Sequence, residues 1–125
     1  QRNIVVTGGN SGVGLETARG LYGDGYTIII AAELAEKYRG HQGHHPIQTQ
    51  LKGNIKYFPL DLAKRESVEK FANFVKEQFS HLDVLINNSG MIRNEKTMHE
   101  NGVEMTYMIN HFGPFYLTYL LFGLL

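Results

Sequence analysis

Near its start the chain carries the sequence Thr7-Gly8-Gly9-Asn10-Ser11-Gly12-Val13-Gly14, and the rest of the sequence is arranged around it. An apolar run precedes it and a helical pattern follows it, so it forms the turn between a strand and a helix. Its glycines allow close backbone approach to a ligand, and Asn10 and Ser11 tolerate such turns. The following helix points its unpaired N–H groups and the positive end of its dipole at this loop. The stretch therefore predicts a site for a dinucleotide pyrophosphate.

A glycine turn between strand and helix also occurs without a ligand, so the motif alone leaves both interpretations open. The residues Gly9 to Gly14 have the spacing of a P-loop, but Leu15-Glu16 follows where a P-loop requires Lys and then Ser or Thr. Nucleoside triphosphate hydrolysis is therefore disfavoured.

The composition indicates a globular domain that binds a small molecule. The 125 residues are 42% hydrophobic and 19% charged, which allows one domain with a core. Twelve basic and twelve acidic side chains cancel, so no electrostatic footprint for nucleic acid is present. The absence of cysteine fits a reducing compartment. We expect an intracellular protein, cytoplasmic or held on the cytosolic face of a membrane by segments outside these residues.

The two ends of the sequence carry further expectations. The chain begins without Met, directly at its first strand, which indicates a trimmed or partial sequence with no visible signal peptide. Its longest apolar run, Phe115 to Leu125, is shorter than the ~20 residues that a membrane-spanning helix needs. We interpret this run as a buried helix end.

The first elements form a βαβ unit. Arg2 to Thr7 predicts a buried strand, Gly12 to Tyr22 a helix, and Tyr26 to Ala31 a second strand. A dinucleotide turn occurs in this context, which strengthens the prediction. Glu33 follows the second strand, 19 positions after Gly14, where a dinucleotide fold places an acid on the ribose hydroxyls. Alternatively, Glu33 lies in the first turn of a helix, where the dipole favours acids.

Residues 34–53 give no functional signal. They contain His41, His44 and His45, but no carboxylate or cysteine stands in metal-ligand spacing with them. We expect a solvated surface loop and no metal site.

Two more strand and helix pairs complete the pattern. Asn54 to Leu60 predicts a third strand followed by Asp61-Leu62, and the helix from Lys64 to Phe79 carries apolar residues at helical spacing. Asp61 either bonds an adenine ring or caps this helix. The sequence from His81 to Ile86 predicts a fourth strand, which ends at Asn87-Asn88-Ser89-Gly90. The pattern predicts an α/β fold with a doubly wound parallel sheet, whose ligand lies outside the carboxyl ends of the strands.

A long last helix follows. Asn101 and Glu104 form a capping pattern, and apolar residues at helical spacing continue from Met105 to Tyr119. Gly113-Pro114 interrupts the helix, because proline lacks the N–H that would bond the carbonyl of Asn110. We expect a kink there that leaves this carbonyl able to hold a water molecule.

Four motifs in this order resemble the short-chain dehydrogenase/reductase family, close to its retinol dehydrogenase-like branch. They are residues 7–14, Phe58-Pro59-Leu60-Asp61-Leu62, Leu82-Asp83-Val84-Leu85-Ile86-Asn87-Asn88-Ser89-Gly90 and Asn110-His111-Phe112-Gly113-Pro114-Phe115. The resemblance implies a three-layer α/β/α Rossmann domain that covers residues 1–125 with the first four strands present, incomplete at the carboxyl end.

The resemblance also implies the residue roles. Gly8, Asn10, Ser11, Gly12, Val13 and Gly14 would hold the pyrophosphate of NAD or NADP. Asp61 and Leu62 would hold the adenine. Asn87, Ser89 and Gly90 would line the adenosine ribose, and Asn110 would belong to a catalytic tetrad with Ser, Tyr and Lys.

Three features depart from the family pattern. Ser89 replaces the usual Ala. Glu33 stands where this branch carries Arg for the 2′-phosphate of NADP, so NAD is slightly favoured. The catalytic Ser and the Tyr-x-x-x-Lys pair are missing, since no Tyr is followed four positions later by Lys.

The sequence therefore predicts the cofactor-binding portion of an oxidoreductase that moves hydride between nicotinamide and an alcohol or carbonyl substrate, such as a retinoid, steroid or other lipophilic molecule. The alternative is a truncated, non-catalytic product that binds dinucleotide or pairs with intact subunits through its last helix. A methyltransferase is disfavoured, because it leaves Asn110 and the Asn-Asn-Ser-Gly segment unexplained.

Overall fold

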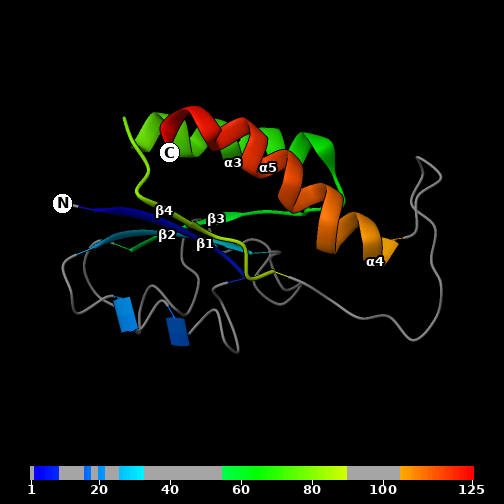
Figure 1. The fold of residues 1–125 in the computed structure, drawn as a ribbon, viewed down its shortest axis with the longest axis horizontal. Coiled ribbons are helices and arrows are strands. Elements are labelled where there is room, and N and C mark those ends of the chain that lie inside the picture. Colours follow the sequence, from blue (N-terminus) through cyan, green and yellow to red (C-terminus); the bar gives the residue numbers. More distant parts are fainter. Residues whose placement is uncertain (1, 9–15, 18–19, 22–25, 33–54, 90–104) are drawn as a thin grey trace.

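The structure is a computed structural model that describes residues 2–8, 16–17, 20–21, 26–32, 55–89 and 105–125. At its centre lies a parallel sheet in the strand order β3-β2-β1-β4, drawn in Figure 1. The strands are β1 (Asn3–Thr7), β2 (Thr27–Ala32), β3 (Ile55–Pro59) and β4 (Val84–Ile86). Because all neighbouring pairs are parallel, the four carboxyl ends lie at one edge of the sheet. This arrangement confirms the predicted parallel sheet.

Helices cover both faces of the sheet. The helix α3 (Arg65–Gln78) lies beside α5 (Gly113–Leu121) on one face, as Figure 1 shows. The described helical residues 16–17 and 20–21 lie on the other face. The last helical region begins as α4 (Met105–Tyr107), widens into the π-helical segment η2 (Met108–Phe112), continues as α5 and ends in the 3-10 turn η3 (Phe122–Leu124). The predicted doubly wound α/β/α architecture is confirmed.

The two faces of the sheet bury alternate residues of each strand. Val5 and Ile29 belong to a core cluster with side chains of α3 and α5, including Phe71 and Leu117. Ile4, Val6, Ile28 and Ile30 form a second cluster on the opposite face, against which Leu21 packs. Since successive side chains of a strand point to opposite faces, both sets are apolar only if both faces are covered. This explains the continuous apolar runs of the first two strands.

The fourth strand is shorter than predicted. It begins at Val84 and not at His81, and the N–H of Leu82 bonds outside the sheet. The N–H of Leu82 donates to the carbonyl of Leu124 in η3 at 2.8 Å, and that of Asp83 donates to the carbonyl of Asn3 at 2.9 Å. The N–H of Asn3 in turn donates to the Asp83 carboxylate at 2.7 Å and lowers the pKa of that group below its ordinary value. These bonds close the amino-terminal edge of the sheet and join the last helix to it.

The apolar face of the last helix differs from the predicted one. Gly113, Leu117 and Leu121 are buried against α3 and the sheet, at a spacing of four residues. Phe115 and Tyr119, which the sequence placed on the apolar side, are 66% and 71% exposed. The interpretation of Phe115 to Leu125 as a buried helix end is therefore wrong for its outward-facing half.

A close contact explains which side faces inward. A Cβ added to Gly113 would lie 2.4 Å from the carbonyl oxygen of Leu62 and 2.8 Å from the Leu62 Cβ. The helix can approach the chain after β3 this closely only because residue 113 has no side chain. Gly113 therefore sets the rotation of α5, with Leu117 and Leu121 following on the same side.

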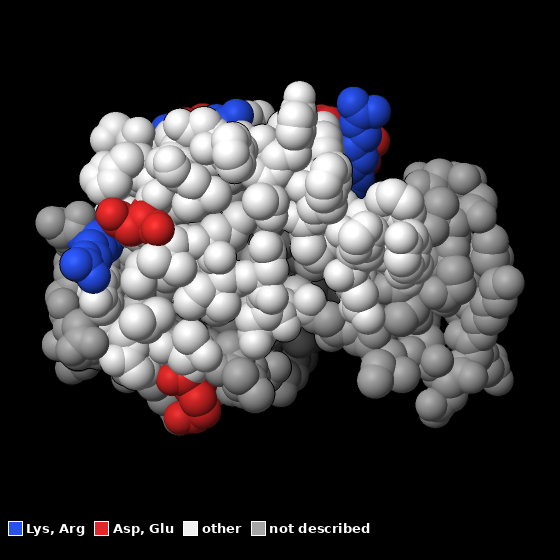
Figure 2. Space-filling view, viewed as in Figure 1, with Lys and Arg blue, Asp and Glu red and all other residues white. Residues whose placement is uncertain are grey.

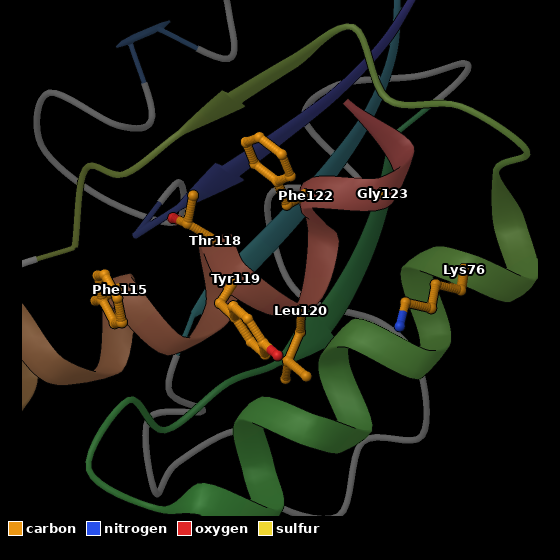
Figure 3. Close-up of a pocket in the computed structure, with 7 residues that line it drawn as sticks. All are labelled: Lys76, Phe115, Thr118, Tyr119, Leu120, Phe122 and Gly123. Atoms are coloured by element: carbon orange, nitrogen blue, oxygen red, sulfur yellow. The ribbon is translucent and has the colours of Figure 1, made fainter.

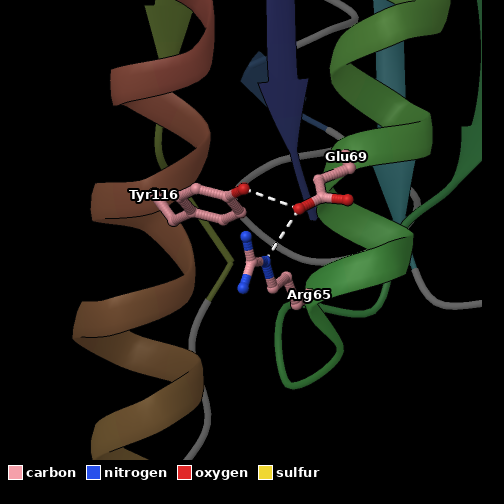
Figure 4. A network of polar contacts seen from close by, with 3 residues as sticks. All are labelled: Arg65, Glu69 and Tyr116. Atoms are coloured by element: carbon pink, nitrogen blue, oxygen red, sulfur yellow. Dashed lines mark hydrogen bonds and ion pairs between the residues drawn. The ribbon is translucent and has the colours of Figure 1, made fainter.

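Three polar side chains join α3 to α5, as Figure 4 shows. The hydroxyl of Tyr116 donates to Glu69 Oε1 at 2.7 Å, and Arg65 Nε donates to the same oxygen at 2.8 Å. The bond with Tyr116 holds the pKa of Glu69 below its ordinary value, and the same bond raises the pKa of Tyr116. We name Tyr116, Glu69 and Arg65 the interhelix clasp.

Across the described part of the chain, none of the helices has the length and apolar character needed to cross a membrane.

Candidate functional site

The first element of the site is the start of the glycine turn. Gly8 has φ of +69°, a conformation that L side chains rarely adopt. Its N–H donates to the carbonyl of Ala31 at the end of β2 at 2.6 Å. A Cβ at Gly8 would lie 2.9 Å from Ser89 Oγ and 3.1 Å from Ser89 Cα. The turn therefore needs glycine here for its conformation and for the close packing of the Asn88-Ser89 segment.

The second element is the buried hydroxyl of Thr7. Its Oγ1 accepts hydrogen bonds from the main-chain N–H groups of Asn88 and Ser89, each at 3.0 Å. It donates to the carbonyl of Ile86 at 3.4 Å. The side chain of Asn88 donates to the carbonyl of Gly8 at 3.4 Å. These bonds hold the segment after β4 against the glycine turn, so two of the predicted motifs form one unit.

Asn87 connects this unit to the last helix. Its side-chain Nδ2 donates to Thr118 Oγ1 at 3.2 Å, and that hydroxyl donates to the carbonyl of Pro114 at 2.8 Å. Asn87 is exposed and follows β4 directly, one position beyond the pair that Ile86 forms with Val6. It therefore stands at the carboxyl edge beside Thr7.

Asp61 and Leu62 lie beyond the carboxyl end of β3. Asp61 Oδ1 accepts from the N–H of Ala63 at 3.0 Å, and the main-chain N–H of Asp61 donates to Ser67 Oγ at 2.8 Å. The N-cap of α3 is Lys64, so the alternative in which Asp61 caps this helix is wrong. The side chain of Leu62 is buried in the core against Gly113. Any contact of Leu62 with an adenine ring would therefore come from its main chain.

Asn110 lies in the π-helical segment η2 and is exposed. The N–H of Gly113 donates to the carbonyl of Met108, five residues back, just before Pro114. The helix is thus interrupted where the sequence predicts it, in the form of a widened turn. Such turns are frequent at functional sites.

Some predicted residues lie outside the described part of the chain. These are Asn10, Ser11, Gly12, Val13 and Gly14 of the turn, Glu33, Gly90, Asn101 and the three histidines of residues 34–53. Sequence reasoning, in turn, missed the roles of Thr7 and Thr118. The signal for Thr7 was a hydroxyl side chain at the end of an apolar strand, and that for Thr118 was a Thr four residues after a proline.

A hollow lies along α5 and η3. Figure 3 shows its lining, which is formed by Lys76, Phe115, Thr118, Tyr119, Leu120, Phe122 and Gly123. The side chain of Thr118 points towards the strands, whereas Phe122 and Tyr119 are more than 70% exposed. The hollow is largely apolar, with Lys76 as a cation at its rim.

Comparison with known proteins decides the family. The family model described as short chain dehydrogenase matches residues 2–125. The chain belongs to the short-chain dehydrogenase family. It is 35% identical to human retinol dehydrogenase 13 and 34% identical to the WW domain-containing oxidoreductase of Gallus gallus, over 96% and 94% of its own length. These matches confirm the resemblance to the retinol dehydrogenase-like branch.

Solved structures with a similar fold support this assignment to the family. The alcohol dehydrogenase of Thermococcus sibiricus complexed with 5-hydroxy-NADP has a TM-score of 0.76 and 26% identity, over 98% of this chain and 52% of that one. The RhlG/NADP active-site complex of Pseudomonas aeruginosa has a TM-score of 0.75 and 29% identity, over 98% and 46%. The chain spans 36% of retinol dehydrogenase 13 and 28% of the WW domain-containing oxidoreductase. It thus corresponds to a part of each relative.

The residues present fit the dinucleotide of a short-chain dehydrogenase. Gly8 lets the start of the turn lie directly against Ser89 at the carboxyl edge, and main-chain groups approach this edge from β1, β2 and β4. Ligands of doubly wound sheets bind at this edge. An NAD(P)-type cofactor is therefore compatible with the described geometry.

Proposed function

We propose that residues 1–125 form an NAD(P)-binding Rossmann domain, incomplete at the carboxyl end, of an oxidoreductase that transfers hydride between nicotinamide and an alcohol or carbonyl. The observation that carries this proposal is Gly8, held at φ +69° against Ser89 at the carboxyl edge of the sheet. Membership of the short-chain dehydrogenase family and the NADP complexes named in two similar structures support it. When bound, the nicotinamide supplies or accepts the hydride.

The residues of this chain bind and orient the dinucleotide. The turn that begins at Gly8 receives the pyrophosphate, with Asn10, Ser11, Gly12, Val13 and Gly14 completing it. Asp61 and the main chain of Leu62 receive the adenine, and Asn87, Ser89 and Gly90 receive the adenosine ribose. Asn110 holds a water molecule that serves proton transfer. Among the lipophilic substrates considered, the names of the retinol dehydrogenase relatives support a retinoid.

A titration of NADH into the chain, followed by nicotinamide fluorescence, tests the proposal. We expect saturable binding that weakens by about tenfold or more in Gly8→Ala, because the new side chain is strained and displaces the Ser89 segment. Gly123→Ala is the matched control, since nothing lies within 4 Å of a Cβ there. Absence of NADH binding by the wild type, or equal binding by Gly8→Ala, contradicts the proposal.

We propose that NAD(H) is preferred to NADP(H). Glu33 follows the end of β2, where a carboxylate accepts from the ribose 2′-hydroxyl and repels a 2′-phosphate. The same titration with both cofactors tests this in the wild type and in Glu33→Arg. Equal affinities in the wild type, or no shift towards NADPH in the variant, exclude Glu33 from the ribose site.

The alternative is a non-catalytic product that binds dinucleotide or pairs with intact subunits. The exposed side chains of the last helix favour self-association in either case. We propose a homo-oligomer that forms through this helix, an intracellular location, and no nucleic-acid partner, given the balanced charge.

A further inference from the structure

Thr118 is the residue of α5 that reaches the predicted cofactor edge. Its hydroxyl lies 2.8 Å from the carbonyl oxygen of Pro114 and 3.2 Å from Nδ2 of Asn87. The side chain is half-buried and points towards the strands, as Figure 3 shows. One hydroxyl thus connects a main-chain carbonyl of α5 with the first residue after β4.

The chemistry of the three groups fixes the direction of both hydrogen bonds. The Pro114 carbonyl can only accept, so it takes the single proton of the Thr118 hydroxyl. The hydroxyl oxygen then has only lone pairs to offer to Asn87. The amide of Asn87 must therefore turn its NH₂ group towards α5 and its Oδ1 away from it. The orientation of this amide follows from the bond to Pro114, and it would otherwise be ambiguous.

We infer that Thr118 is a positioning residue that orients the Asn87 amide so that Oδ1 accepts a hydrogen bond from a hydroxyl of the adenosine ribose. This inference rests on the proposed function. Asn87 is exposed, so an amide without this partner would sample several rotamers and would have to be ordered when the cofactor binds. Thr118 removes that cost beforehand, because α5 is itself fixed by the contact of Gly113 with Leu62 and by the interhelix clasp.

The test is a double-mutant cycle on NADH binding to the whole chain. Thr118→Val keeps the shape of the side chain and removes the hydroxyl. We expect NADH to bind about threefold to tenfold more weakly, the range of one neutral hydrogen bond. Thr118→Ser restores a hydroxyl and should recover most of the affinity. Tyr119→Phe is the matched control, because it removes an exposed hydroxyl from the neighbouring position and should change nothing.

The cycle is completed in an Asn87→Ala background, where Thr118→Val should have no further effect because its target is gone. An equal loss in both backgrounds shows that Thr118 acts only on the fold and overturns the inference. Unchanged NADH binding in Thr118→Val overturns it as well, while the wild type still binds and the proposed function stands. Absence of binding by the wild type contradicts the proposed function first, and the inference falls with it.

Discussion

The hydroxyl oxygen of Thr7 and the main-chain nitrogen of Ser89 lie 3.0 Å apart, although 82 positions separate the two residues in the chain. The same oxygen accepts from the N–H of Asn88. A buried side chain of β1 thereby holds the backbone after β4, and it joins the two motifs that we propose to contact the cofactor.

Thr7→Val should destabilise the protein and weaken NADH binding together. Valine has nearly the same shape, but it removes the Thr7 acceptor of the Ser89 N–H, whereas the N–H of Asn88 keeps a second acceptor in the carbonyl of Ile86. We expect a loss of about 1–3 kcal/mol in the free energy of unfolding, the usual cost of one unsatisfied polar group. Urea unfolding measures it. Thr7→Ser should recover most of the loss, and a Val variant of wild-type stability would show that these bonds contribute little.

Gly113→Ala should lower stability by about 1–3 kcal/mol, the usual cost of overpacking a well-filled core. The added Cβ meets the backbone of Leu62, which cannot rotate away as a flexible side chain could. Gly123→Ala, in the turn after α5, meets nothing and serves as the control in the same urea titration. Equal midpoints for the two variants would contradict the account of how α5 approaches the sheet.

The interhelix clasp should stabilise the protein in a defined pH window. The pKa of Glu69 is lowered from 4.5, so its contribution is complete above that value and is lost as the pH falls through the lowered pKa. The pKa of Tyr116 is raised from 10.0, so its contribution is complete below that value and is lost as the pH rises through the raised pKa.

Thermal unfolding of wild type and Tyr116→Phe across this range measures the effect. The difference in unfolding midpoint between the two proteins should be constant between pH 4.5 and pH 10.0 and should shrink outside this pH range. Because these side chains are partly exposed, we expect the difference to be modest. Tyr119→Phe should show no such difference at any pH, and a pH-independent gap in Tyr116→Phe would mean that the clasp does not titrate.

The chain should self-associate. Figure 2 shows a broad face with charged side chains only near its margins, and it contains the side of the molecule on which β4 and α5 lie. Phe115, Tyr119 and Phe122 are all more than 60% exposed, and β4 is an edge strand among the described strands. Tyr116 and Leu120 of the same helix are half-buried and do not belong to this patch, because Tyr116 bonds Glu69 and Leu120 packs against the core.

Size-exclusion chromatography with light scattering should find oligomers or aggregates for the wild type. A triple variant, Phe115→Ser, Tyr119→Ser and Phe122→Ser, should shift the population towards monomer. Both forms should lack dehydrogenase activity in a nicotinamide absorbance assay, since they contain no Tyr-x-x-x-Lys pair. A monomeric wild type would contradict the exposed-patch argument, and turnover would reveal a catalytic group within these residues.

Asn110→Ala should affect turnover and not cofactor binding. This prediction concerns an intact enzyme made by joining the chain to the carboxyl-terminal portion of retinol dehydrogenase 13. We expect kcat to fall far more than the NADH affinity, because the proposed role is to hold a water for proton transfer. The melting temperature should barely change, as the side chain is exposed. Full turnover in this variant would make Asn110 an ordinary helix residue.

Sequence patterns predicted β1 and β2 well because these strands are buried on both faces and therefore read as continuous apolar runs. They also located the helix interruption, since proline has a local steric effect at Pro114. The inward face of α5 was predicted wrongly, because Phe115 and Tyr119 outweigh Gly113 in apolar content. The inward side of α5 is set by the space available beside Leu62. The periodicity of the sequence gives no information about that space.

The polar contacts could not be predicted from the sequence for a related reason. Thr7 and Ser89, or Asn87 and Thr118, become neighbours only when the strand order places β4 beside β1. The motifs themselves could be located from local spacing, but their hydrogen-bond partners depend on contacts between distant parts of the chain.

The last helical region contacts the rest of the protein at four positions along its length. The contacts are Gly113 with Leu62, Tyr116 with Glu69, Thr118 with Asn87 and Leu124 with Leu82. Inserting one residue would rotate everything after it by about 100° and advance it by about 1.5 Å. All later attachments would then miss their partners at once. We therefore expect homologous proteins to vary freely in the outward side chains of this helix while conserving the number of residues between Gly113 and Leu124.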